Sequence, residues 1–167
     1  MCRLNTQKLG PATVTSEIHL AGRALFGDPD TDHRQALDRH YNQGPPAGWN
    51  QNHVSSYATM HPAEDWAQTF AHYLHIRDTL DTSAAFGFTA SSATFERRTL
   101  RPSGFDTIIE MWLPLAWALN MVNRSMAATA STPSCCWKPV LEKMRFIHTT
   151  IDEFTSNPAK LASAGGA

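Results

Sequence analysis

The sequence has little cysteine, no long apolar run and no excess of charge of one sign, and each shortage excludes a class of protein. Its three cysteines, Cys2, Cys135 and Cys136, form no Cys-x-x-Cys pair and leave an odd thiol. This pattern disfavours both a disulfide framework and a thiolate zinc site. The 14 basic and 15 acidic residues form no basic stripe of the kind that binds a nucleic-acid backbone. We therefore expect no nucleic-acid partner.

The apolar residues do not predict a membrane protein either. The longest apolar run, Met111 to Leu119, is interrupted by Pro114 and is far shorter than the roughly 20 residues that a membrane span needs. The first residues also lack the apolar stretch of a signal peptide. We expect a cytoplasmic protein with no membrane partner, and a chain of 167 residues ordinarily forms one domain.

Helical periodicity is the main pattern that the sequence does contain. It predicts helices over residues 17–26, 30–41, 61–81, 105–126 and 140–154. Asp30 or Thr31 is expected to cap the second helix, and Pro114 is expected to kink the fourth. Residues 1–15 are expected to stay loose. The predicted fold class is mainly α, with no internal repeat.

The segment from His61 to Asp81 carries most of the chemistry, because it combines an acidic pair, three histidines and three large aromatic residues. On a helical wheel, Glu64, Gln68 and His75 share one face with Ala71. The other face holds large apolar side chains that we expect in the core: Trp66, Phe70, Tyr73 and Leu74. A carboxylate and an imidazole can therefore line the same cleft, and we add Tyr57, His61, Asp65 and His72 as further candidate site-lining residues.

A series of short motifs resembles the C-terminal half of the putative zinc-binding metallopeptidase family, over most of residues 23–151. The most specific are Glu64-Asp65-Trp66-Ala67 and Phe70-Ala71-His72-Tyr73-Leu74-His75. Supporting motifs are Phe26-Gly27-Asp28, Arg39-His40-Tyr41, Gly44-Pro45-Pro46, Ser56-Tyr57-Ala58, His61-Pro62, Asp78-Thr79-Leu80, Asn123-Arg124-Ser125-Met126 and Lys143 to His148.

The resemblance implies a gluzincin-like site, in which zinc is the cofactor and a peptide or protein is the substrate. In such a site a His-Glu-x-x-His helix supplies two zinc ligands and the general base. A carboxylate from a later helix supplies the third ligand, and by position this is Glu64. Gln68 stands where the family usually has Glu, so a charge near the metal is expected to be lost.

No His-Glu-x-x-His occurs in these 167 residues, so the base and two ligands are missing from the expected site. We therefore expect a truncated, inactive portion of a zinc-dependent metallopeptidase. Its predicted organisation is a poorly ordered or non-homologous segment over residues 1–22, a helical metallopeptidase-like region over 23–154 and a flexible tail over 155–167.

Several alternatives remain at this point, for single residues and for the whole chain. Glu64 could simply interact with the helix dipole, and Tyr57 and His61 could fasten a loop to the helix start. His72 and His75 could be an ordinary packed or exposed pair. The chain could also be a non-catalytic helical interaction module that self-associates through an exposed groove beside Glu64, or hold a separate metal site built from Glu64, His61, His72 and His75.

Overall fold

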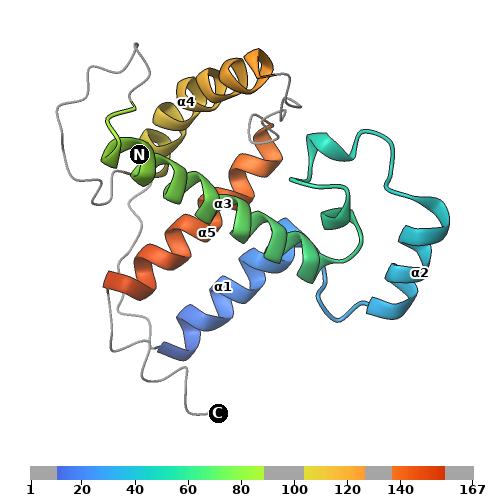
Figure 1. Cartoon of the computed structure of the whole chain (residues 1–167). Helices are drawn as coiled ribbons and strands as arrows, with labels where there is room; N and C mark the ends of the chain where they lie inside the picture. Colours follow the sequence, from blue (N-terminus) through green and yellow to red (C-terminus); the bar gives the residue numbers. More distant parts are fainter. Residues whose placement is uncertain (1–10, 89–103, 127–136, 157–167) are drawn as a thin grey trace.

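The computed structural model describes residues 11–88, 104–126 and 137–156, and it is entirely helical in these ranges (Figure 1). Its helices are α1 (Pro11–Phe26), α2 (His33–Gln43), α3 (Pro62–Ala85), α4 (Phe105–Ser125) and α5 (Lys138–Ser156), with single 3₁₀ turns η1 (Trp49–Gln51) and η2 (Tyr57–Thr59). The predicted mainly α class is confirmed. None of the helices described is long and apolar enough to cross a membrane.

Three predicted helices, those corresponding to α3, α4 and α5, are confirmed with boundaries within a few residues. The prediction was wrong at the first helix, because α1 begins at Pro11 and residues 11–15 are therefore helical and not loose. It was also wrong about the cap of α2. Asp32 has extended backbone angles and its carboxylate accepts hydrogen bonds from the backbone N–H of Arg34 and Gln35, whereas Asp30 and Thr31 lie outside the helix.

Helix α3 is the centre of the structure, with α1, α4 and α5 packed against it (Figure 1). One stripe of α3 is buried, at intervals of three or four residues that correspond to one helix face: Asp65, Thr69, Tyr73, Ile76 and Leu80. Apolar residues of α4 and α5 complete the core around it: Phe105, Ile108, Leu115, Val140, Met144 and Ile147. The burial of these side chains is the main favourable contribution to folding.

The buried stripe of α3 differs from the predicted one. Tyr73 is buried as expected and Phe70 is partly buried. Trp66, however, is 45% exposed and Leu74 is 40% exposed, so the prediction that these two side chains point into the core was wrong. Trp66 instead stacks on Phe70, with 5.1 Å between the ring centroids.

Helix α2 stands apart from this core. It lies to one side of α3 in Figure 1, and Ala36 is its one buried residue. Gly27 precedes it and Gly44 ends it, and both have positive φ, 99° and 73°, a conformation that glycine adopts without steric cost. Helix α2 is therefore fixed mainly by its two ends and by polar contacts described below.

A buried hydrogen-bonded chain joins α3 to α5. Arg77 Nη1 donates to the Tyr73 hydroxyl oxygen at 3.0 Å, and the same hydroxyl lies 2.7 Å from His148 Nδ1. The guanidinium can only donate to the hydroxyl oxygen, whereas the direction of the bond between the hydroxyl and His148 depends on which ring nitrogen of His148 carries the proton. Burial lowers the pKa of His148; Asp152 opposes this shift, whereas Arg77 and Arg145 add to it.

The lowered pKa of His148 in this hydrogen-bonded chain predicts that acid destabilises the protein. The unfolded chain takes up a proton on His148 near pH 6.5, whereas the folded protein resists protonation, so the free energy of unfolding should fall as the pH drops below about 6.5. Burial also lowers the pKa of His53 and of His72, which adds to the effect. Urea unfolding at pH 7.5 and pH 5 measures the difference.

Two variants assign the effect. Replacing His148 with Gln should reduce the acid-induced loss, whereas replacing His19, an exposed residue of α1, should leave it unchanged. Tyr73→Phe should cost about 1 kcal/mol at neutral pH because one buried hydrogen bond is lost. If the free energy of unfolding depends on pH equally in the His148 and His19 variants, protonation of His148 does not cause the acid-induced loss.

Candidate functional site

Glu64, the predicted zinc ligand, lies in the first turn of α3, where Pro62 occupies the first helical position. Its side chain is 27% exposed, and its Oε1 atom lies 3.5 Å from Nε2 of His33 in α2. The positive end of the helix dipole favours a carboxylate here. Glu64 therefore sits at the surface with one imidazole beside it.

His61 is the N-cap of α3 and has both ring nitrogens engaged. Nδ1 accepts a hydrogen bond from the backbone N–H of Ala63 at 3.1 Å, and Nε2 donates to the carbonyl oxygen of Thr31 at 3.0 Å. The first bond gives the backbone N–H of Ala63 an acceptor, which the start of a helix otherwise lacks. His61 lines a pocket, but it cannot bind a metal without giving up one of these bonds.

His33 is a site residue that sequence reasoning missed. Its ring lies 5.0 Å from that of His61, in addition to its contact with Glu64. The sequence around His33 does not have the His-Glu-x-x-His spacing of a zinc-binding helix. The signal is its position directly after the capping residue Asp32, which aims the first turn of α2 at the start of α3.

The residue after Glu64 points the opposite way. Asp65 is 2% exposed, and its Oδ2 atom lies 2.5 Å from Nζ of Lys143 in α5. The Lys143 ammonium also donates to the carbonyl oxygen of Asn52 at 2.8 Å, and the Thr69 hydroxyl donates to Asp65 Oδ1 at 3.3 Å. A buried charge pair is tolerated only when its remaining bonding positions are satisfied in this way.

His53 adds an imidazole to the pair. Its Nε2 atom lies 3.7 Å from Asp65 Oδ2. Burial lowers the pKa of His53, with Asp65 opposing the shift and Lys143 adding to it. Burial also raises the pKa of Asp65, although Lys143, His53 and Thr69 all act in the opposite direction. Burial thus disfavours the charged form of both His53 and Asp65, and the contact with Lys143 is one of the interactions that oppose it at Asp65.

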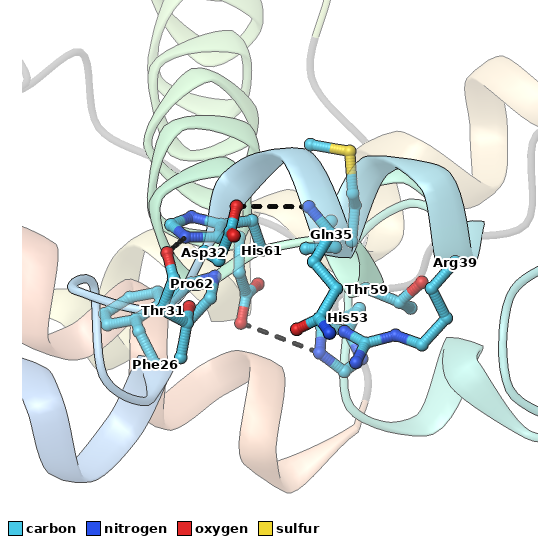
Figure 2. Close-up of a pocket in the computed structure, with 13 residues that line it drawn as sticks. Phe26, Thr31, Asp32, Gln35, Arg39, His53, Thr59, His61 and Pro62 are labelled. Carbon is cyan, nitrogen blue, oxygen red and sulfur yellow. Dashed lines mark hydrogen bonds and ion pairs between the residues drawn. The ribbon is translucent and has the colours of Figure 1, made fainter. Parts of the chain in front are cut away.

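A pocket of about 410 Å³ lies between α2 and the start of α3 (Figure 2). From α2 it is lined by Asp32, Gln35, Ala36 and Arg39. The facing wall contains His53, Ala58, Met60, His61 and Asp65, and Phe26, Thr31, Thr59 and Pro62 complete the lining. Of the predicted site-lining residues, the pocket brings together His61 and Asp65.

Tyr57 and Gln68 support the loop that forms this wall. Gln68 Oε1 accepts a hydrogen bond from the Ser55 hydroxyl at 3.3 Å, and the ring of Tyr57 packs edge-on against His40 of α2, with 5.8 Å between the centroids. Desolvation raises the pKa of Tyr57, and the nearby Glu64 carboxylate acts in the same direction. Both residues lie near Glu64, but neither lines the pocket.

His72 and His75 lie further along α3. Burial lowers the pKa of His72, and His75 adds to the shift. Nε2 of His72 is buried and has no hydrogen-bond partner among the residues described, whereas His75 is exposed. Among the residues that the structure describes, no third donor joins this pair, and Glu64, His61, His72 and His75 do not form a metal-binding group.

Comparison with known proteins explains the motifs of α3. The family model described as putative zinc-binding metallo-peptidase matches residues 12–150. The chain belongs to this family. The match begins before residue 23, where the resemblance was expected to start, and therefore includes most of α1.

Curated relatives that this chain matches include uncharacterised proteins of Mycobacterium. One from Mycobacterium bovis and one each from two Mycobacterium tuberculosis strains are 65% identical to this chain over 129 residues. The aligned region is 77% of this chain and 38% of each relative, so the chain spans well under half the length of the relatives that it matches. No solved structure matches.

The metal-binding side chains among the described residues do not fit the zinc that the family name implies. Zinc in a hydrolytic site is held by three protein ligands. Within residues 11–88, 104–126 and 137–156, no group of three or more His, Cys, Asp or Glu side chains could hold a metal. The Glu64 carboxylate has His33 beside it, and the role of Glu64 as a ligand stays a prediction.

The buried pair gives a sharper prediction about stability. Lys143→Met should lower the free energy of unfolding by about 3 kcal/mol or more, because it leaves the Asp65 carboxylate buried without its partner. Adding Asp65→Asn to Lys143→Met should cost less than the sum of the two single changes. Denaturant unfolding of the two single variants and the double variant measures this coupling.

Arg145 and Asp106 provide the control, because they form a two-bond ion pair between α5 and α4 at the surface. Arg145→Met should have a much smaller effect, since water solvates the remaining carboxylate. Similar losses for Lys143→Met and Arg145→Met would contradict the assignment.

Proposed function

We propose that this chain is the helical C-terminal portion of a zinc-dependent metallopeptidase, in which Glu64 is one zinc ligand. The observation that carries the proposal is the position of Glu64: it is partly exposed in the first turn of α3, within the residues that match the family. His33 would orient the Glu64 carboxylate, as a neighbouring imidazole commonly does for a carboxylate ligand.

The chain itself is proposed to be inactive. Two zinc ligands and a general base would have to come from a His-Glu-x-x-His helix, which these residues do not contain. One carboxylate with an adjacent imidazole leaves too few ligands to hold zinc. A peptide or protein remains the proposed substrate of the complete site, and the cytoplasm remains its predicted location.

The metal content of two proteins tests this proposal. The present chain, dialysed against zinc and then against buffer, should retain no stoichiometric zinc and cleave no peptide. A chimera is made by joining this chain to the residues of the Mycobacterium tuberculosis relative that lie outside the match. This chimera should bind one zinc per chain. Glu64→Ala in that chimera should lower zinc affinity by at least about tenfold.

Asp78→Ala is the matched control, since Asp78 is an exposed carboxylate on the same helix and its replacement should leave zinc bound. One zinc retained by the present chain and lost on Glu64→Ala would overturn the proposed inactivity. Unchanged affinity in the Glu64→Ala chimera would overturn the role of Glu64.

A second candidate function is a non-catalytic interaction module. The observation that favours it is an apolar strip on α3, on the side of Glu64, where four residues are exposed: Trp66, Ala67, Ala71 and Leu74. Alanines next to large apolar side chains allow a second helix to approach closely, and we propose that copies of the chain associate here.

Self-association through this strip is measurable by sedimentation at several protein concentrations. The chain should form dimers, and Trp66→Lys should weaken the association by roughly tenfold or more, because a large aromatic contact is replaced by a charge. Asp38→Lys introduces a cation at an exposed position of α2, on a different helix from the strip, and should change the association little. A monomer at all concentrations would rule out this module.

A further inference from the structure

Arg39 is the residue of the pocket whose chemistry the fold leaves unused. It lies in α2 and lines the pocket, yet within the part of the chain that the structure describes its guanidinium takes part in no hydrogen bond or ion pair. A guanidinium offers five N–H donors in a planar fork and stays charged at all ordinary pH values. A cation placed in a pocket without an acceptor is suited to an anionic ligand.

The acidic residues of the lining do not supply that acceptor. The Asp65 carboxylate is held by Lys143 at 2.5 Å. The Asp32 carboxylate accepts from the backbone N–H of Arg34 and Gln35 at 2.9 and 3.2 Å and so caps α2. Both carboxylates are engaged by other groups, and neither forms an ion pair with Arg39.

Two further side chains surround the same part of the pocket. Gln35 lies one helical turn before Arg39, and Figure 2 shows both side chains extending from α2 toward His53. The Gln35 amide can donate a hydrogen bond beside the guanidinium. Burial lowers the pKa of His53, so the imidazole near Arg39 is neutral and adds no second charge.

We propose that this pocket binds a carboxylate group, with the Arg39 guanidinium as its anchor. A planar carboxylate matches the guanidinium fork through two parallel hydrogen bonds, and the volume of about 410 Å³ is in the range of small-ligand sites. Ala36, Ala58 and Met60 give the ligand an apolar surface to contact.

The position of the pocket also indicates the kind of molecule that carries the carboxylate. His61 lines the pocket and its ring lies 5.0 Å from that of His33, the residue that contacts Glu64, so the pocket lies close to the proposed zinc ligand. In a peptidase this is a place for part of the substrate, either an acidic side chain or the carboxyl end of the peptide. This last step rests on the proposed function, whereas binding of a carboxylate does not.

Short peptides distinguish the two sources of a carboxylate. Acetyl-Ala-Glu-amide carries one on its side chain, acetyl-Ala-Ala carries one at its end, and acetyl-Ala-Gln-amide carries none. Each is titrated into the ¹⁵N-labelled chain in the presence of a chelator while the Arg39 side-chain resonance and the amides lining the pocket are followed. One or both acidic peptides should shift these resonances, and the neutral peptide should not.

Variants of two arginines on α2 test the anchor. Arg39→Met should weaken binding of the acidic peptide by about tenfold or more. Arg39→Lys keeps the charge but loses the planar fork, so its affinity should lie between those of the unchanged protein and Arg39→Met. Arg34→Met is the control, because Arg34 is an exposed residue of the same helix outside the pocket lining. A circular dichroism spectrum confirms that each variant is folded.

Three results would overturn the proposal: no shift with either acidic peptide, equal binding of the neutral peptide, or equal losses in the Arg39 and Arg34 variants. The titrations use the present chain and contain no metal, so they do not depend on the proposed zinc ligand. Failure of the chimera to bind zinc would therefore not contradict carboxylate binding. Failure of the acidic peptides to bind would not contradict the proposed zinc ligand.

Discussion

The ion pair between Lys143 and Asp65 fixes the part of the molecule on which the candidate site depends. It joins α5 to the first turn of α3 at 2.5 Å, and the same ammonium holds the carbonyl oxygen of Asn52 at 2.8 Å. Three segments far apart in the chain thus meet at one buried charge. A residue-long displacement of any of them would leave that charge without a partner, which is costly in a protein interior.

This constraint also sets the direction of Glu64. Consecutive residues of an α-helix point about 100° apart, so fixing Asp65 in the interior directs its neighbour toward the surface. The Asp65 carboxylate holds the helix in place, and the Glu64 carboxylate before it remains available to bind a ligand. The pocket and the apolar strip lie on different sides of the same turn, so one buried pair orients all three features.

Local signals predicted much of the fold. Pro62 and the acidic first turn mark the start of α3, and Gly44-Pro45-Pro46 marks the end of α2, because these residues act through the backbone next to them. The buried stripe could not be predicted in the same way. It passes through Asp65 and Thr69, whose polarity favours the surface, while Trp66 and Leu74, whose hydrophobicity favours the core, are exposed. Only the ammonium of Lys143, 78 residues away, makes the interior suitable for Asp65. The contact of His33 with Glu64 likewise joins two helices that no sequence spacing connects.

Helix α2 has a different physical character from the helices around it. It buries one residue, Ala36, and lies between Gly27 and Gly44; at its N-terminal side, Gly27 packs so closely on Pro62 that an added Cβ would lie 3.2 Å from the proline ring. With little apolar surface to lose, α2 can open at a small fraction of the free energy that unfolds the whole domain. Its amide hydrogens would exchange with solvent while those of α3 and α5 remain protected, so the wall that carries Arg39 can yield to a ligand without disturbing the wall that carries Asp65.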